Sequence, residues 1–346
     1  MFSWLKSVML LSALLPVLVS VIFLSGCGRQ QDGTSGPGGG TGQDSGKISV
    51  VTTIFPPYDF VREIAGNRAE LKMLLKPGEE SHSYEPTPQD IIAIEECDVF
   101  IYTGGENDVW VEDILSSMRD EDRLILRMAD CVDTVEEEHV EGMKESPGHD
   151  HDEHDMHSDS GTGEEDTHTV HEIDEHVWTS PVNAALIVDQ IKQLLIQADP
   201  SGQAVYEENA AIYEEKLTEL DQEFRDVVDH AKRKLLIFGD RFPFRYFADE
   251  YGLSYYAAFT GCSTETEASA ATVAFLTDKV KEEQIPVVFT IELSNEKIAD
   301  SICEATGAKK MTLYSCHNMT KEQMENGATY LSMMMENVDS LRAALN

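Results

Sequence analysis

Basic residues are scarce in this sequence. Its 346 residues include 26 lysines and arginines but 64 aspartates and glutamates, which gives a formal net charge of -38. A chain with this charge repels nucleic-acid phosphates and anionic lipid headgroups, so we expect neither as a partner. The same charge favours cations as ligands.

Motifs of hydrolytic enzymes are missing as well. The chain has no H-E-x-x-H and no G-x-S-x-G stretch, and its "TGG" at 103–105 is too short for a phosphate-binding loop. The alternative of a metal-dependent hydrolase would also need an open coordination position and a general base. We therefore expect a protein that is not an enzyme.

Long apolar runs are missing outside the N-terminal region. There, Lys6 precedes an apolar stretch from 8 to 24, and "LSGC" ends at Cys27. This order predicts a secretory signal peptide over 1–26, with Cys27 lipidated as the new N-terminus; the alternative is an ordinary signal peptide or a membrane span. Residues 27–46 predict a flexible tether. We expect an extracytoplasmic protein, anchored by lipid to the outer face of the cell membrane.

Cysteines are few. Outside the cytoplasm disulfides can form, but an odd number of cysteines leaves at least one thiol unpaired. Besides Cys27 the chain has Cys97, Cys131, Cys262, Cys303 and Cys316.

Short apolar segments alternate with helical patterns along the rest of the chain. Stretches such as 48–55, 98–103, 234–239 and 286–291 predict strands, and helical segments separate them. This alternation predicts parallel sheets with helices on both faces, an α/β fold.

One predicted helix is unusually long. From Gln203 to Ala231 the sequence has no Gly or Pro, and apolar residues recur at spacings of four and three. Such a helix would span roughly 43 Å and could join two domains at a fixed angle; the alternative is a surface helix of one domain. The apolar stripe consists of Tyr213, Leu217, Leu220, Phe224, Val227 and Ala231.

The length of the chain exceeds what one hydrophobic core usually serves, so we expect two domains. We place an N-terminal lobe at 47–200, a linking helix at 201–232 and a C-terminal lobe at 233–346. An acidic loop at 133–175 holds 17 acidic residues and one lysine. Charge repulsion and the lack of hydrophobes predict that this loop is disordered.

Seven of the 11 histidines lie in the acidic loop. The stretch "HDHDEHDMH" places His149, His151, His154 and His157 among four carboxylates. Each metal site there would have to be assembled from a flexible chain, so we expect weak, multiple zinc binding. The loop would gather zinc near a tighter site; the alternative is a solvated loop without a metal role.

Three other histidines predict the tighter site. His82 follows a predicted strand, His176 precedes a helix, and His317 follows the last predicted strand. Open α/β folds bind ligands at the carboxyl edges of their sheets, and neutral imidazole suits zinc, copper, iron and nickel. The three side chains could converge between two domains, although each taken alone could be a surface residue.

Several stretches together resemble the zinc/manganese substrate-binding lipoproteins of bacterial ABC importers. They are "TTIFPPYDFVREIAG", "PGEESHSYEPTPQD", "DEHVWTSPVNA", the Asp199-Pro200, Tyr206 and Asn209 pattern, "YFADEYGL" and "IADSICEATGAKK". The resemblance implies two four-stranded α/β lobes joined by one long helix, with a metal bound between them. It also implies a monomeric receptor that delivers the metal to an ABC permease.

The resemblance assigns the metal ligands unevenly. His82 and His176 match the two ligands of the N-terminal lobe. Gly239 stands where a His or Glu is expected as the third ligand, and the neighbouring Asp240 could replace it. Glu292 would orient a ligand without binding the metal.

For the fourth ligand the resemblance implies an Asp, but this chain has "YSCHN". We favour His317. Cys316 could instead be a thiolate ligand or form a disulfide with Cys262. A site rich in histidine favours zinc over manganese, which prefers more carboxylates. An alternative function is a surface zinc buffer or adhesin that uses the acidic loop.

Overall fold

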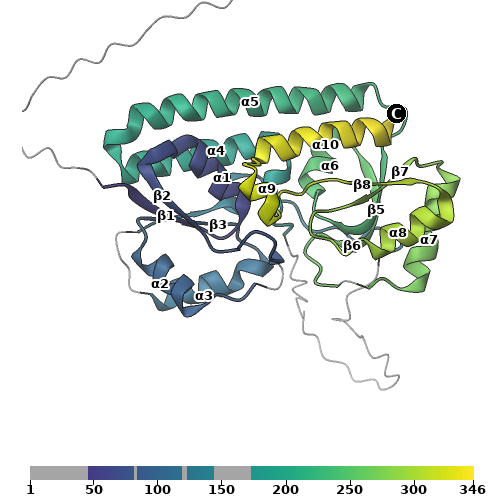
Figure 1. Ribbon diagram of the computed structural model, residues 1–346, viewed down its shortest axis with the longest axis horizontal. Coiled ribbons are helices and arrows are strands. Elements are labelled where there is room, and N and C mark those ends of the chain that lie inside the picture. Colours follow the sequence, from purple (N-terminus) through teal and green to yellow (C-terminus); the bar gives the residue numbers. More distant parts are fainter. Residues whose placement is uncertain (1–45, 82–83, 119–122, 144–172, 266) are drawn as a thin grey trace, which may run out of the picture. The chain divides into compact units, whose positions relative to one another are not determined.

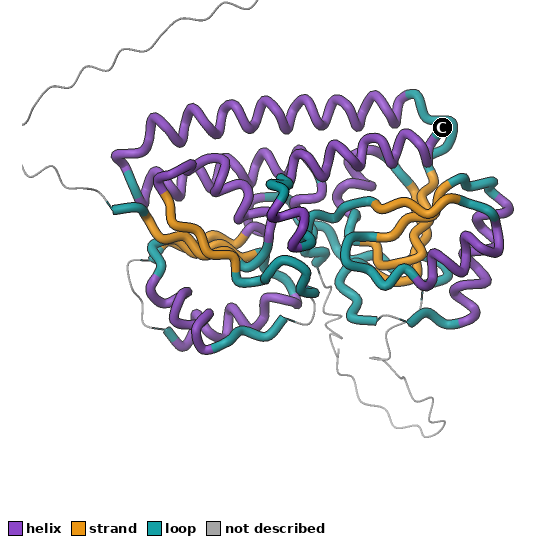
Figure 2. Tube along the Cα trace, in the orientation of Figure 1, coloured by secondary structure: helices purple, strands orange, loops and turns teal. Residues whose placement is uncertain are grey.

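The structure, a computed structural model, describes residues 46–81, 84–118, 123–143, 173–265 and 267–346. From residue 46 on, the chain forms one compact unit with two parallel four-stranded sheets. Figure 1 shows the sheets side by side under two long helices, and Figure 2 shows the helices on both faces of each sheet. Among the described residues, no helix has the length and apolar character needed to cross a membrane.

The N-terminal sheet has the strand order β2-β1-β3-β4. Its strands alternate with helices, so all neighbours run parallel. Consecutive residues of β1 and β3 point into different cores: Val50 into the main core and Val51 into a smaller one. The elements are β1 (Ile48–Thr52), α1 (Phe55–Ala65), β2 (Ala69–Met73), α2 (Pro88–Glu96), β3 (Val99–Tyr102), α3 (Val109–Ser117) and β4 (Leu124–Arg127).

The C-terminal sheet repeats this plan with the strand order β6-β5-β7-β8, again parallel throughout. A shift in register interrupts β5 between Phe238 and Arg241. The elements are β5 (Leu235–Phe242), α6 (Arg245–Tyr251), β6 (Ser254–Thr260), α7 (Ala270–Glu282), β7 (Val287–Thr290), α8 (Lys297–Thr306), β8 (Lys309–Thr312) and α9 (Lys321–Glu325). The predicted α/β fold with two small parallel sheets is confirmed.

Two helices span the sheets. After α4 (Pro181–Ala198), helix α5 runs from Gln203 to Asp229 and packs against α1, α4, α6 and α10. Its predicted stripe is buried from Tyr213 to Val227, and Ala231 lies just beyond the helix. The long helix that joins the lobes is therefore confirmed.

The second spanning helix, α10 (Tyr330–Leu345), was not expected. At its start the backbone N–H of Tyr330 donates to Asp59 of α1 (2.8 Å), and at its end the carbonyl of Leu345 accepts from Lys232, just before β5 (2.9 Å). One hydrophobic core continues from the first sheet through α5 and α10 to the second. The predicted boundaries of the lobes, at 200/201 and 232/233, stay a prediction, because one hydrophobic core serves both lobes.

The predicted disorder of 133–175 is wrong at both ends of that loop. The N–H of Asp174 donates to the carbonyl of Val135 (2.9 Å), and Glu136 and Ile173 form an antiparallel bridge. Three apolar side chains of this loop pack against the main core: Val135, Val140 and Met143. Its carboxylates accept hydrogen bonds from the C-terminal lobe; the hydroxyl of Tyr255, for example, donates to Glu138 (3.1 Å). Apolar contacts and paired charges therefore order the two ends; 144–172 lie outside the described residues.

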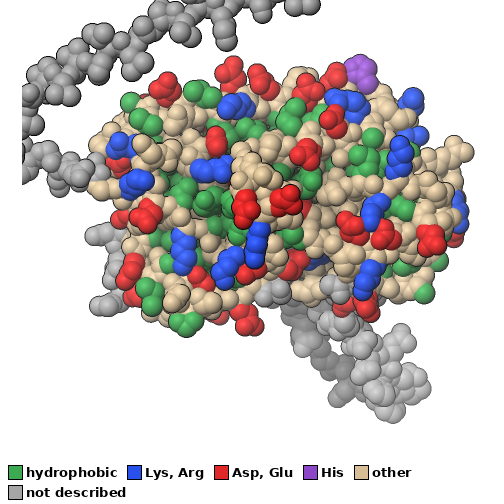
Figure 3. All heavy atoms as spheres, in the orientation of Figure 1, with side chains coloured by type: hydrophobic (Ala, Val, Ile, Leu, Met, Phe, Trp, Pro, Cys, Tyr) green, Lys and Arg blue, Asp and Glu red, His purple; other side chains and the backbone are tan. Residues whose placement is uncertain are grey.

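The described surface is mixed in charge. Figure 3 shows acidic and basic side chains interspersed over one face. Many form ion pairs, such as Arg225 with Glu250 of α6 (2.5 Å) and Lys310 with Asp300 of α8 (2.5 Å).

Candidate metal site

A pocket of about 330 Å³, including its opening to solvent, brings two predicted ligands together. His176 precedes a short 3-10 turn (Val177–Thr179), and His317 lies between β8 and α9. Their ring centroids are 5.3 Å apart and the ring planes are nearly perpendicular, at 84°. The described structure thus brings together in one pocket two imidazoles that lie 141 residues apart in the chain (317 − 176).

Asp174 fixes the ring of His176. The backbone N–H of His176 donates to the Asp174 carboxylate (2.8 Å), and ring Nδ1 lies 3.0 Å from the same oxygen. Because a carboxylate only accepts hydrogen bonds, the proton lies on Nδ1 and the lone pair on Nε2, the form in which imidazole binds metals. Burial alone lowers the pKa of His176, but the Asp174 carboxylate outweighs it and the pKa is raised.

Both lobes hold the residues before His176. The hydroxyl of Tyr246 on α6 donates to the carbonyl of Asp174 (2.7 Å). On the other side, the backbone N–H and side-chain amide of Asn107, just before α3, donate to the carboxylate of Glu175. Burial raises the pKa of Glu175 to about 7. Of the two residues before His176, Asp174 is therefore bonded to the C-terminal lobe and Glu175 to the N-terminal lobe.

His317 is held differently. Its backbone N–H donates to Glu292 after β7 (2.9 Å), and its ring Nδ1 lies 3.3 Å from the hydroxyl of Ser81, which belongs to the other lobe. The carboxylate of Glu292 also accepts from the N–H (2.7 Å) and hydroxyl (2.6 Å) of Ser315. Burial raises the pKa of Glu292. Glu292 therefore holds the segment that carries His317, and its role in orienting a metal ligand stays a prediction.

The third-ligand position is closed to any side chain. A Cβ on Gly239 would lie 2.5–2.7 Å from the backbone and Cβ of Ala299 in α8, so only glycine fits. The carboxylate of Asp240 accepts from the N–H groups of Arg241 (2.9 Å) and Ile291 (3.3 Å) and lines a neighbouring hollow. Asp240 does not line the pocket of the two histidines, so the geometry does not favour it as a ligand.

The pocket wall contains Arg241, which we did not predict. The register shift in β5 lies just before it, and its side chain lines the pocket with both histidines. The alternation of a regular strand does not identify such a residue, because an irregular strand re-aims its side chains.

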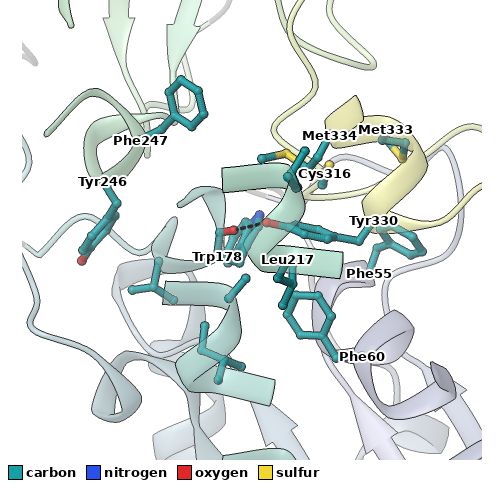
Figure 4. Close-up of a cluster of buried hydrophobic side chains, with 14 of the residues drawn as sticks. Phe55, Phe60, Trp178, Leu217, Tyr246, Phe247, Cys316, Tyr330, Met333 and Met334 are labelled. Atoms are coloured by element: carbon teal, nitrogen blue, oxygen red, sulfur yellow. Dashed lines mark hydrogen bonds between the residues drawn. The ribbon is translucent and has the colours of Figure 1, made fainter. Parts of the chain in front are cut away.

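Cys316 belongs to the hydrophobic core. Figure 4 shows its side chain beside Met334 and near Tyr330, whose hydroxyl donates to the carbonyl of Trp178 (2.7 Å). The residue is fully buried with φ of +60°, and burial raises the pKa of its thiol well above the usual value. Cys316 and Cys262 are both free thiols, so the suggested disulfide is wrong: Cys316 points into the core and Cys262 lies in the loop after β6.

Several predicted site residues lie outside the described residues: His82, Cys27, His149, His151, His154 and His157. The pocket is lined by Glu79, Glu80 and Ser81, which directly precede His82 in the sequence. Within the parts of the chain that the structure describes, no three His, Cys, Asp or Glu side chains are arranged to hold a metal ion.

This fold and pocket define a two-lobed binding protein, and sequence comparison gives its family. The chain belongs to the family described as "Zinc-uptake complex component A periplasmic", which matches residues 50–344. It is 31% identical to the high-affinity zinc uptake system protein ZnuA of Bacillus subtilis over 334 residues, 96% of this chain and 97% of the relative. The suspected relationship is confirmed, and the family is one of uptake receptors rather than enzymes.

A second relative is longer than this chain. The zinc-binding lipoprotein AdcA of Streptococcus pneumoniae is 31% identical over 336 residues, 95% of this chain but 60% of the relative. The chain therefore spans about three fifths of the length of that lipoprotein.

Solved structures share the fold. The Zn(II)-bound ZnuA-like domain of S. pneumoniae AdcA has a TM-score of 0.69 at 28% identity, covering 87% of this chain and 99% of that domain. The metal-dependent lipoprotein YcdH of B. subtilis has a TM-score of 0.70 at 29% identity, covering 87% and 100%.

Proposed function

We propose that this chain is an extracytoplasmic receptor that binds one zinc ion between its lobes and delivers it to an ABC permease. The observation that carries the proposal is the pair of facing imidazoles, His176 and His317, with the first set by Asp174 for metal binding. The names of the relatives, a zinc uptake protein and a zinc-binding lipoprotein, support zinc as the cargo.

The proposed ligands are His82, His176 and His317. A nitrogen-rich set with one water or carboxylate suits tetrahedral zinc, whereas manganese would be better served by more oxygen ligands. Asp240 is a weaker candidate for the fourth position, because it does not line the pocket and its carboxylate already accepts from two backbone N–H groups.

The receptor role includes a location and a partner. Lipidation of Cys27 would hold the protein, as a monomer, on the outer face of the cell membrane, next to the permease. The relative from S. pneumoniae is named a lipoprotein, which agrees with this location. In the same proposal, the histidines at 149–157 collect zinc weakly and do not form the tight site.

The test is zinc titration of the full-length protein against competing chelators, with manganese for comparison. We expect one tight zinc site that His317→Ala or His82→Ala abolishes and that deletion of 148–163 leaves intact. Several weak sites that disappear with the deletion and ignore both histidines would instead identify a zinc buffer. Transport itself is tested by zinc-limited growth of cells that carry the His317→Ala protein, which should be impaired.

A further inference from the structure

A positive charge lines the pocket in which we propose that a cation binds. The side chain of Arg241 is only 9% exposed and shares the pocket with His176 and His317. A guanidinium group stays protonated in proteins. At the distances inside one small pocket, a unit charge repels a divalent cation strongly unless another charge compensates it.

The compensating charge is Glu80. Its two carboxylate oxygens accept from Nη1 (3.2 Å) and Nη2 (3.0 Å) of Arg241, and Nη1 also donates to the carbonyl of Ser263 (3.2 Å). Glu80 follows β2 in the N-terminal half and Arg241 lies on β5, so this two-pronged ion pair joins the lobes at the pocket. Such paired geometry is the strongest form of the arginine–carboxylate interaction.

The other carboxylates of the pocket have different partners. Glu292 accepts three hydrogen bonds from Ser315 and His317, and Glu79 lies 3.6 Å from the ammonium of Lys76. Glu80 is therefore the carboxylate of this pocket that offsets Arg241.

We propose that Glu80 and Arg241 set the metal affinity of the pocket with opposite signs. This inference rests on the proposed function. Loss of the Glu80 charge leaves a guanidinium facing the metal, which weakens binding. Loss of the Arg241 charge leaves a carboxylate facing the metal, which preserves or strengthens binding. The pair thus keeps zinc affinity below what the histidines and Glu80 would give without Arg241, which helps a receptor that must release its cargo.

Other bonds hold the Glu80 loop in place without the ion pair. The side-chain amide of Asn318 donates to the carbonyls of Lys76 and Glu79 (both 2.8 Å), and the N–H of Gly78 donates to the carbonyl of Met319 (2.7 Å). Variants of Glu80 and Arg241 should therefore fold, and their effects should be electrostatic.

The experiment compares Glu80→Gln, Arg241→Gln and the double variant by chelator competition for zinc in the full-length protein. We expect at least about tenfold weaker binding for Glu80→Gln, from uncompensated repulsion. Arg241→Gln should bind as tightly as the wild type or several-fold more tightly, and the double variant should lie near the wild type. Arg225→Gln is the control, because it removes the same charge from an ion pair on α5 that does not line the pocket.

Two results overturn the inference. If both single variants weaken zinc binding, the ion pair is only a structural link; if neither changes it, the pair does not act on the metal. Thermal unfolding of each variant, with and without zinc, separates a folding defect from a binding defect. His317→Ala, measured in parallel, tests the proposed function itself: wild-type affinity in that variant refutes the site, whatever Glu80 and Arg241 do.

Discussion

The two pocket histidines are both held by a carboxylate, but their rings have different partners. In each case, a carboxylate accepts the backbone N–H of the histidine: Asp174 for His176 and Glu292 for His317. Asp174 also engages the ring of His176, two residues along the chain, whereas the ring of His317 meets Ser81 of the other lobe. The ring of His176 is therefore oriented by a neighbour in the chain, and the ring of His317 by a contact between the lobes.

Among variants that keep the proposed histidine ligands, Asp174→Ala should weaken zinc binding most. Asp174→Ala removes the acceptor of the His176 ring, so zinc affinity should fall about 10- to 100-fold, as for other residues that orient metal-bound histidines. Asp174→Asn should lose less, because an amide oxygen can still accept from Nδ1. Chelator competition measures both. The control is Asp189→Ala, on the exposed side of α4. Wild-type zinc affinity in Asp174→Ala would contradict the idea that Asp174 orients the His176 ring for metal binding.

Glu292→Gln tests the hydrogen bonds that hold the His317 segment. Glutamine has the same shape but turns an NH2 group toward the donors from Ser315 and His317, so at least one buried donor loses its acceptor. We expect the unfolding free energy of the metal-free protein to fall by about 1–3 kcal/mol. Zinc binding should weaken as well, because the His317 segment loses its support. Denaturant unfolding without metal and chelator competition measure the two effects. Unchanged stability would show that Glu292 does not hold this segment.

Stability should depend on pH through Asp59, whose carboxylate accepts from the N–H of Tyr330 at the start of α10, after the His317 segment. Burial raises its pKa to about 6, against the opposing effect of Arg62. Between pH 6 and about 4, the folded protein keeps a proton that the unfolded chain has lost. The contribution of Asp59 to the unfolding free energy therefore increases as the pH falls through 6.

Asp59→Asn should lack this increase. Between pH 7 and pH 4, the unfolding free energy of the wild type should rise relative to that of this variant by up to about 3 kcal/mol. Urea unfolding of metal-free protein at several pH values measures the difference. A difference that does not vary with pH would mean that Asp59 has nearly the same pKa in the folded protein and in the unfolded chain.

The smallest expected effect on zinc is that of Cys316→Ala. Its side chain is buried beside Met334, away from the pocket, so zinc affinity should stay within about twofold of the wild type. Stability should fall by about 1 kcal/mol from the small cavity. Unfolding and zinc competition on the same sample check both outcomes; a large loss of zinc affinity would identify the thiol as a ligand after all.

The two spanning helices show how far periodicity predicts the fold. The stripe from Tyr213 to Val227 predicts α5 and its buried face, because spacings of three and four recur over about four turns. Helix α10 also has a clear capping box at Thr329, but nothing local predicts that it reaches from Asp59 to Lys232. Local pattern specifies a helix, and the packing of both lobes specifies its partners.

The candidate site shows the same limit around β5. The sequence predicts a strand at 234–239, whereas β5 continues to Phe242, and strand alternation alone does not choose which residue after Gly239 faces the pocket. A shift in register and the close approach of Ala299 decide that it is Arg241. Side-chain direction at an irregular strand depends on the helix packed against it.

Periodicity and neighbours in the chain are enough to predict the order of strands and helices, the long helix, and the close placement of Asp174 and His176. Tertiary packing is needed to bring His176 opposite His317, to place Ser81 at the His317 ring, and to pair Glu80 with Arg241 across 161 residues. Such contacts exist only once both sheets pack against α5 and α10, since no local interaction can bring residues so distant in the chain together.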